Sequence, residues 1–441
     1  MRPYSMLCLY TLAALASTGS QVGAYELYSR DDTHLSANLE AAFGAFHSQQ
    51  RYAPSGRLAQ GSASWREGYI KYGLSGDQGI GETGAAYGAF ALLSSGTWGE
   101  GDAAGFSDGS ERTTQIEDAY LGWRSGARFE ALGENGVDLS FGRQNIVVGD
   151  GFLIQGDGLN LGRGTNDGQL NRGGAYYLAA RKAFDKTAVL RIGGQEGWRG
   201  DLMWLKSDNR AQADTQMNVG TLEHVAQAGT VGLTYIHITD ISKQYASPLQ
   251  LERDGMKTYS VRASGNAGVH NLFLSGEYAS QHKPDASNEN AWYMEAGWTF
   301  ANTRWAPGVS YRYSRFSQGY DTLFYGLSRG YGTWFQGEVA GNYAGPFNSN
   351  SRIQNVTLKA SPLENLTVGA LYFHYDTLDR RLGNTDGQEV DLYAEWHVNE
   401  NLTVMPLVGF YRPSKSAEQG GLQLGNNETN VYAQLVFAMG F

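Results

Sequence analysis

The last twelve residues, NVYAQLVFAMGF (430–441), alternate in polarity up to a terminal aromatic residue. One face of this segment carries Val431, Ala433, Leu435, Phe437 and Met439. A period of two residues indicates a β-strand. A strand of large apolar side chains leaves an open edge unless another strand pairs with it, and closure of a barrel removes that edge. We therefore predict that the chain is a closed β-barrel whose last strand pairs with its first.

Alternating segments recur along the whole chain between breaks rich in Gly, Asn and Asp, with no convincing helical stretch. This pattern predicts one all-β domain over residues 25–441. The predicted strands are 35–46, 67–75, 85–93, 116–123, 137–147, 175–182, 188–194, 216–225, 231–238, 258–264, 271–280, 291–300, 308–316, 353–360, 366–375, 390–398, 402–411 and 430–441.

Two further runs, 201–207 and 333–343, compete for the status of strands. Bacterial barrels have even strand numbers, short periplasmic turns and longer external loops, so all long connections should lie on one side. This rule places 317–350 in a single external loop and makes 188–207 one strand with an extension. The prediction is a transmembrane antiparallel barrel of 18 strands with periplasmic termini and long extracellular loops.

The N-terminus has the pattern of a secretory signal peptide. Arg2 precedes the apolar stretch 6–16, and Val22-Gly23-Ala24 resembles a cleavage site, so we expect residues 1–24 to be removed. Cys8, the single cysteine, lies in that segment, which leaves the mature chain without a disulfide or thiolate metal site. We therefore expect export to the bacterial outer membrane, with no metal and no cofactor.

Composition agrees with a barrel that contacts outer-membrane lipid. The mean hydropathy is −0.40, yet the chain contains 59 Gly and 12% aromatic residues, as expected of lipid-facing aromatics around a polar lumen. The net charge is −10, and removal of Arg2 with the signal peptide gives −10 − 1 = −11. An acidic chain of this kind is an unlikely partner for nucleic acid.

In each strand the less apolar parity should face the lumen. The predicted pore-lining and solute-contacting residues are Arg143, Arg181, Arg191, Arg262, Arg312, Lys359, Glu277, Glu295, Asp391 and Glu395. Charges of both signs can form a selectivity filter, or they can keep the lumen hydrated and brace loops. Strict alternation would put Arg143 on the lipid face with Phe141, so we expect a bulge at Gly142 to turn it inward.

The segment 148–174 is long and Gly-rich, and we expect it to fold into the lumen and narrow it. Its spaced aspartates could alternatively hold Ca²⁺, although they do not have EF-hand spacing.

Two catalytic patterns are better explained as loops. Residues 105–109 (GFSDG) match G-x-S-x-G without a strand and helix around them, and residues 79–84 match G-x-G-x-x-G between two strands. We therefore predict that the chain is not an enzyme.

The chain resembles the alginate-export family of outer-membrane proteins. The resemblance rests on FGRQ (141–144), FYGLSRGYGTWFQGEVAGNY (324–343), NSNSRIQNVTLKAS (348–361) and GQEVDLYAEWHVNENLTVMPLVGFYRP (387–413). It implies an 18-stranded barrel through which an anionic uronate polysaccharide leaves the cell, guided by luminal arginines. By this resemblance Arg143, Arg312 and Lys359 are anion-contacting positions, and export implies periplasmic partners.

One feature departs from the resemblance, because acidic residues face the predicted lumen of what should be a polyanion channel. The sequence therefore leaves two functions open. The first is passive, electrostatically guided passage of acidic polysaccharide or oligosaccharide. The alternative is a substrate-selective diffusion porin for small solutes such as sugars, organic acids or aromatic acids. An outer-membrane enzyme is a third and weaker hypothesis.

Overall fold

The computed structural model describes residues 24–53, 61–326 and 337–441. The predicted signal peptide lies outside the described residues except for Ala24. The strands of the main sheet are β1 (Tyr25–Arg30), β2 (Thr33–Ser48), β3 (Ala63–Gly79), β4 (Ala85–Gly99), β5 (Arg112–Arg124), β6 (Val137–Gln144), β9 (Phe184–Ile192), β10 (Gly197–Lys206), β11 (Gln216–Ala226), β12 (Gly229–Asp240), β13 (Lys257–Gly265), β14 (Leu272–His282), β15 (Glu289–Thr299), β16 (Gly308–Phe316), β17 (Ser351–Leu363), β18 (Leu366–Thr377), β19 (Gly387–Asn399), β20 (Leu402–Pro413) and β21 (Asn430–Gly440).

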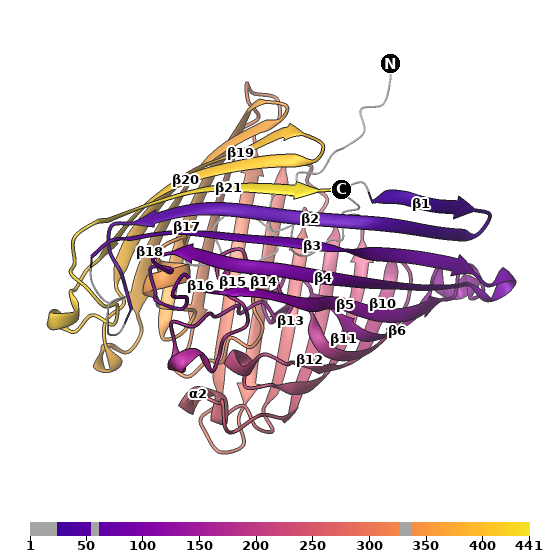
Figure 1. Cartoon of the computed structure of the whole chain (residues 1–441), viewed down its shortest axis with the longest axis horizontal. Coiled ribbons are helices and arrows are strands. Elements are labelled where there is room, and N and C mark those ends of the chain that lie inside the picture. The colour runs from indigo at the N-terminus through magenta and orange to yellow at the C-terminus, as the bar shows by residue number, and fades with distance from the viewer. Residues whose placement is uncertain (1–23, 54–60, 327–336) are drawn as a thin grey trace.

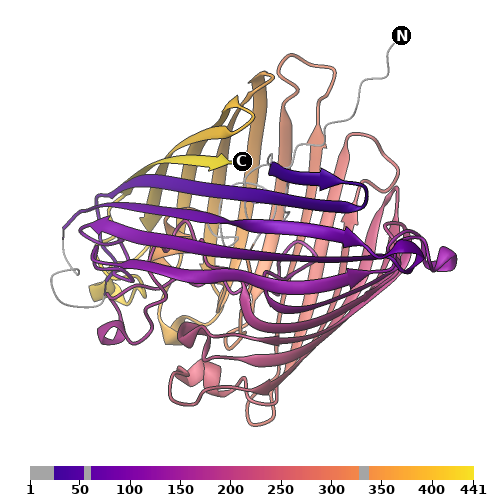
Figure 2. The ribbon, with the colours of Figure 1, turned by 45° about the vertical axis from the view of Figure 1, so that its right-hand side comes forward.

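These strands form a closed antiparallel barrel (Figure 1). The sheet has 19 strands, and β1 pairs only with β2, which leaves 19 − 1 = 18 strands around the barrel. Closure occurs between β2 and β21, where Phe43 lies opposite Phe437. The wall of β2 to β5 faces the opposite wall formed by the salmon and orange strands (Figure 2). The predicted pairing of the last strand with the first is confirmed.

The two ends of the barrel differ in their connections. At one end, which we call the turn end, short links such as 227–228, 364–365 and 400–401 join the strands. The other end, the loop end, carries the long connections 145–183, 241–256, 317–350 and 414–429. The C-terminal end of β21 lies at the turn end (Figure 1).

The alternation in the sequence corresponds to an inside and an outside face. In β15, Met294 and Trp298 are exposed on the outside, whereas Tyr293 is buried inside. In β19, Leu392 is half exposed and the neighbouring Asp391 is fully buried. The face assignment from strand parity is therefore correct in both strands.

Two strand predictions were wrong, and their errors cancelled in the count. Residues 175–182 form no strand, and they belong to the connection 145–183. The predicted single strand 188–207 is a hairpin, β9 and β10, that turns at 193–196. Gly193 (φ 109°) and Gly197 (φ 81°) take left-handed backbone conformations at this turn, which glycine adopts without steric cost.

The backbone explains why the apolar run 175–182 is not a strand. Ala175 and Ala179 have positive φ values of 54° and 43°, which an extended strand does not allow. Its amide groups find acceptors on the barrel wall instead of on a neighbouring strand: Leu178 donates to Glu67 Oε2, and Ala175 donates to Thr97 Oγ1. Tertiary contacts have therefore overridden the local pattern.

The region 337–344 is compact and buried, with a π-helical turn over Ala340–Ala344. The described part of the competing run 333–343 is thus not a strand, and residues 333–336 lie outside the described chain. Within the described ranges, no helix has both the length and the apolar character needed to span a membrane.

Candidate functional site: the barrel lumen

The connection 145–183 enters the lumen and crosses it from wall to wall. Near its start, Asp150 accepts a hydrogen bond from Tyr293 of β15 at 2.6 Å. Near its end, Tyr177 accepts one from Gln434 of β21 at 2.7 Å. A two-stranded ribbon, β7 (Val147–Val148) and β8 (Ile154–Gln155), stiffens the first part. The expected inward fold of 148–174 is confirmed, and we call 145–183 the inward loop.

A second segment, residues 337–344, packs beside the inward loop and fills the loop-end half of the lumen. Tyr343 lies 5.5 Å from Trp65 and 6.3 Å from Tyr176 between ring centroids. The same apolar cluster contains aromatic residues from the wall, namely Phe46, Phe184, Phe316, Tyr375, Tyr411 and Tyr432. The lumen was expected to be polar throughout, but its loop-end half is aromatic because these two segments pack there.

Buried carboxylates of the wall hold both segments through their backbone amides. Glu117 Oε1 accepts from the amides of Lys182 at 2.6 Å and Ala183 at 2.8 Å. Glu389 accepts from Val339 at 2.7 Å and Ala340 at 2.9 Å. Such charge-assisted bonds satisfy donors that a loop inside a barrel would otherwise leave unpaired. Asp391, a predicted pore-lining residue, accepts from the amide of Glu338 at 3.4 Å and has the same bracing role.

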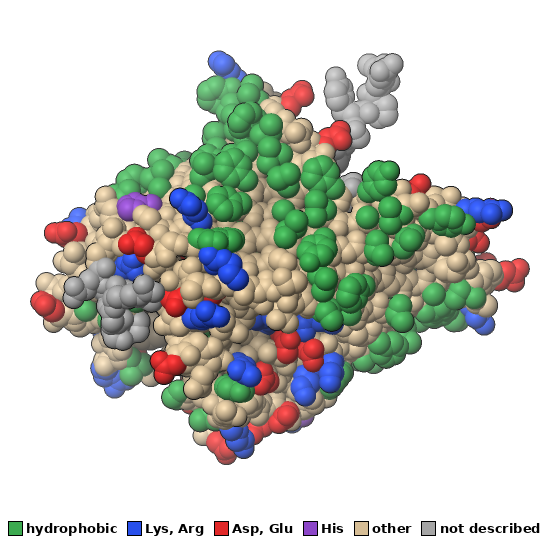
Figure 3. Space-filling view, viewed as in Figure 1, with side chains coloured by type: hydrophobic (Ala, Val, Ile, Leu, Met, Phe, Trp, Pro, Cys, Tyr) green, Lys and Arg blue, Asp and Glu red, His purple; other side chains and the backbone are tan. Residues whose placement is uncertain are grey.

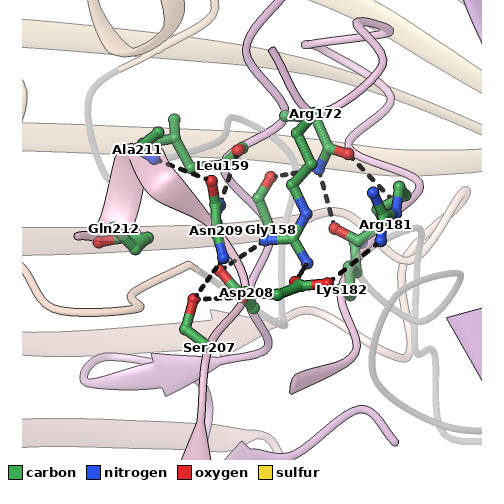
Figure 4. A network of polar contacts seen from close by, with 12 residues as sticks. Gly158, Leu159, Arg172, Arg181, Lys182, Ser207, Asp208, Asn209, Ala211 and Gln212 are labelled. Atoms are coloured by element: carbon green, nitrogen blue, oxygen red, sulfur yellow. Dashed lines mark hydrogen bonds and ion pairs between the residues drawn. The ribbon is translucent and has the colours of Figure 1, made fainter. Parts of the chain in front are cut away.

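Three arginines surround Asp208 at the point where the inward loop meets the wall, and two of them are shown in Figure 4. The distances to the carboxylate oxygens of Asp208 are 2.8 Å from Arg143 Nη1, 3.2 Å from Arg172 Nη2 and 3.6 Å from Arg181 Nη2. Arg143 also lies 3.2 Å from Asp185. We call Arg143, Arg172, Arg181 and Asp208 the arginine cluster.

Asp157 of the inward loop holds the arginine cluster in place through Arg172. Arg172 Nη1 lies 2.8 Å from Asp157 Oδ1, and Ser207 and Asn209 donate to the same carboxylate. The three arginines are more than nine-tenths buried, but the Asp208 side chain is 36% exposed. The cluster is therefore in contact with solvent on the Asp208 side.

Charge compensation determines the protonation of the cluster. Burial alone would raise the pKa of Asp208, but the guanidinium groups of Arg172, Arg143 and Arg181 outweigh burial and lower it below the ordinary 3.8. Burial and the charge of Arg172 lower the pKa of the Arg181 guanidinium below its ordinary value. Several guanidinium nitrogens, among them Arg143 Nε and Nη2, have no hydrogen-bond partner among the described residues. These nitrogens are buried away from solvent.

Two cavities lie beside the cluster within the described chain. The outer cavity, about 460 Å³, is lined by the inward loop, by 244–250 and by Arg253. The inner cavity, about 220 Å³, is lined by Gly156 and Gly158 on either side of Asp157 and by the aromatic residues Phe106, Tyr176, Phe324, Tyr325 and Phe347. Leu159 and Gln212 line both cavities, so the two are adjacent.

The other predicted residues occupy the wall and are mostly paired. Arg262 bridges to Glu223, which also pairs with Arg199 at 2.5 Å. The remaining pairs and positions are Arg312 with Glu295 at 3.6 Å, Arg191 with Asp138 at 3.8 Å, Glu277 accepting from Ser260, Lys359 exposed on β17 and Glu395 buried on β19. The predicted residues are thus brought into one lumen, although only Arg143 and Arg181 meet in one cluster.

Arg143 points inward because of the expected bulge. The register between β6 and β9 shifts between Gly142 and Gln144, and Gly142 has φ 123°. As a result Phe141 is 52% exposed, whereas Arg143 is 7% exposed. A bulge re-aims one side chain at a functional position, and here it brings a charge into the lumen.

Sequence reasoning missed the residues that complete the cluster. Asp208 and Asn209 lie in a short connection between β10 and β11 with no motif around them, and Glu117 falls at an irregularity of the β4–β5 pairing. Arg181 was predicted on a wall strand, but the inward loop carries it. A run of closely spaced charges inside a Gly-rich loop, such as Asp157 to Arg172, was the available signal.

The other chemical hypotheses find little support in the geometry. Ser107 of the G-x-S-x-G pattern is buried and donates to Asp102 at 2.6 Å, which stabilises its loop. Across residues 24–53, 61–326 and 337–441, no group of three or more His, Cys, Asp or Glu side chains is arranged to hold a metal ion. The aspartates of the inward loop engage arginine, tyrosine and amide partners instead.

No protein-family model matches the sequence, and no curated protein matches it at the sequence level. Solved structures do match: OccAB2 of Acinetobacter baumannii (10% identity, TM-score 0.57, 92% of this chain and 98% of that chain) and, from Pseudomonas aeruginosa, OccD3 (OpdP; 11%, 0.56, 97% and 97%) and OccK11 (OpdR; 11%, 0.54, 92% and 96%). At such identities the likeness concerns the fold, so the resemblance to the alginate-export family stays a prediction, and this chain shares a closed 18-stranded barrel fold with these structures.

Proposed function

We propose that this protein is an outer-membrane channel that passes small anionic solutes by passive diffusion. The arginine cluster carries this proposal, because it gathers three guanidinium groups around the partly exposed carboxylate of Asp208. The two adjacent cavities border the inward loop, and Gly156 and Gly158 of the inner cavity flank Asp157, which holds Arg172. Guanidinium groups favour carboxylates and similar anions. Within the diffusion-porin alternative, the solutes that we propose are small organic or aromatic acids.

The same geometry makes small solutes a better proposal than polysaccharide. Two packed segments occupy the loop-end half of the lumen, and a rigid polymer would have to displace their apolar cluster. The structures with a similar fold favour the small-solute alternative over passage of alginate. Export of a uronate polymer with periplasmic partners is therefore the competing hypothesis, which planar bilayer recording can reject.

Passive flux fits the remaining features of the chain. The predicted leader, the closed barrel and the exposed apolar outer face support an outer-membrane location, with outer-membrane lipid as the surrounding partner. Neither catalytic pattern lies in a site that could perform catalysis. The protein needs no cofactor for diffusion down a gradient.

Planar bilayer recording tests the proposal directly. We expect anion selectivity in a KCl gradient and concentration-dependent interference with the current by small carboxylates such as benzoate or succinate. Oligouronates should block at the mouth without permeating. A cation-selective channel, or one that passes oligouronate in liposome flux assays, would contradict the proposal.

A variant links the selectivity to the cluster. Arg143→Gln removes one of the three guanidinium groups while the bulge at Gly142 is kept. We expect weaker carboxylate interference and lower anion preference. The matched control is Arg412→Gln, because Arg412 is an exposed arginine on β20, outside the cluster.

A further inference from the structure

The outer face of β21 and β2 to β5 contains a lateral groove, whose Trp98 and Arg112 side lies near the loop end. Its volume is about 660 Å³, and its walls include Phe43, Ile70, Trp98, Phe437 and Met439. Figure 3 shows hydrophobic side chains gathered on this face of the molecule, with Lys and Arg side chains beside them. The groove therefore lies on the surface that a bilayer would contact.

Strand register explains the groove. Phe437, Phe43, Gly68, Gly96 and Arg112 face one another in a single row across β21, β2, β3, β4 and β5. Two adjacent glycines leave the middle of this row without side chains. A Cβ at Gly68 would lie 3.4 Å from the Trp98 ring, and one at Gly96 would lie 3.3 Å from it, so the ring covers the glycines.

Two arginines stand on either side of Trp98. The Arg112 guanidinium carbon lies 4.2 Å from the ring centroid of Trp98, and Arg112 Nη1 donates to the carbonyl oxygens of Thr97 and Glu111. Arg66 lies directly opposite Trp98 on β3 and is exposed. Arg112 lies opposite Gly96, two residues along β4 from Trp98, so the backbones of Arg66 and Arg112 are separated by two interstrand spacings and a two-residue offset, roughly 12 Å in all. Two long side chains bring this distance within joint reach of one head group.

We propose that this groove binds a phosphate-bearing lipid of the outer leaflet, with its phosphate between Arg66 and Arg112 and one acyl chain in the groove. The proposal rests on the proposed function as an outer-membrane channel and on the predicted extracellular position of the long loops, which puts the loop end at the outer leaflet. Arginine is favoured for phosphate, and a tryptophan marks the membrane interface. A bidentate donor fixed over an aromatic ring beside an apolar groove fits a lipid better than free phosphate.

Neighbouring groups are compatible with an anion at this position. Ser94 and Thr114 are hydrogen bonded at 2.8 Å at the edge of the groove and offer further polar atoms. Glu100 accepts from the amide of Ser64 and is 3.6 Å from Arg51, which compensates its charge. The groove thus combines an uncompensated basic pair with apolar walls.

Native mass spectrometry of the purified full chain in detergent tests the site. The probes are diphosphoryl lipid A, phosphatidylcholine of matched acyl length and inorganic phosphate. We expect preferential retention of lipid A and a roughly fivefold loss of its affinity for each of Arg66→Gln and Arg112→Gln, since a basic residue near a lipid surface contributes about 1 kcal/mol. Ala41→Leu, which fills the groove, should also reduce lipid A retention.

The control is Arg412→Gln, which should leave retention unchanged. Equal retention of lipid A by the Arg66→Gln and Arg112→Gln variants would overturn the proposal, as would equal retention of phosphatidylcholine or competition by millimolar inorganic phosphate alone. Channel conductance recorded on the same variants separates the two proposals. Normal anion-selective currents with no lipid preference reject the groove only, whereas absent or cation-selective currents reject the proposed function.

Discussion

At the scale of single residues, Asp208 is the acid that the three arginines of the cluster share. Its carboxylate compensates three guanidinium groups and stays partly exposed. The predicted arginines alone would make the lumen strongly basic. The structure shows that most of them are matched by an acid, so selectivity depends on small imbalances.

Replacement of Asp208 by Asn should therefore raise anion preference. A unit charge about 5 Å from a permeating ion in a water-like dielectric contributes ~0.8 kcal/mol. Its removal favours chloride and disfavours potassium by roughly fourfold each, so the chloride-to-potassium permeability ratio should rise roughly sixteenfold. Reversal potentials in a KCl gradient measure it. Asp285→Asn, on an exposed loop, is the control. An unchanged permeability ratio in the Asp208 variant would show that the cluster lies outside the conduction path.

The same residue predicts a dependence on pH. Because the folded pKa of Asp208 is lowered, its ion pairs stabilise the folded protein fully above the ordinary value near 3.8 and are lost as the pH falls through the lowered pKa. Protonation then removes the negative charge that the three arginines share, while Asp185, Asp157 and Glu117 each still pair with one of them. We expect chloride preference to rise only below about pH 4, and Asp208→Asn to abolish this rise. A transition that persists in the variant would assign it to another acid.

At the scale of elements, two loop segments inside the lumen donate their backbone amides to carboxylates of the wall. A strand normally satisfies its amides on its neighbours, but three amides of 178–183 and those of 338–340 bond to Glu67, Glu117, Glu389 and Asp391 of the wall. Asp391, one of the acidic residues that conflict with a polyanion channel, thus has a structural explanation. These carboxylates fasten the two segments that narrow the lumen.

Loss of such a carboxylate should loosen the inward loop. Glu117→Ala leaves the amides of Lys182 and Ala183 without their acceptor, at a cost of about 1–3 kcal/mol for each buried donor that water does not reach. We expect larger and noisier single-channel currents while the barrel still resists SDS at room temperature. Glu395→Ala, another luminal carboxylate, controls for charge. Equal noise in both variants would contradict the bracing role.

At the scale of the whole molecule, closure of the barrel separates a turn end from a loop end. This separation predicts topology in the membrane. An epitope inserted at Asp285, in the exposed connection after β14, should be accessible to antibody on intact cells. An epitope inserted after Ala267, in the link between β13 and β14, should become accessible only after permeabilisation. The opposite pattern would show that the barrel, and with it the lipid groove, has the reverse orientation in the membrane.

The strand count shows how sequence and structure relate at this scale. The number 18 was predicted correctly, but through two compensating errors at 175–182 and 188–207. Periodicity identifies a segment that can be a strand, and 175–182 has that pattern. Only the wall acceptors and the positive φ values of Ala175 and Ala179 exclude it.

The sequence by itself determined the barrel, the parity of the strands, the inward turn of Arg143 and the inward fold of the loop. These follow from local rules, because strand alternation, glycine conformation and loop length act over a few residues. The tertiary structure alone decided which charges meet. Asp208, Arg172 and Glu117 come together from segments far apart in the chain, whereas Gly68, Gly96 and Arg112 are aligned by the register of the consecutive strands β3, β4 and β5. Such pairings depend on register and on the path of a long loop, which local patterning does not specify.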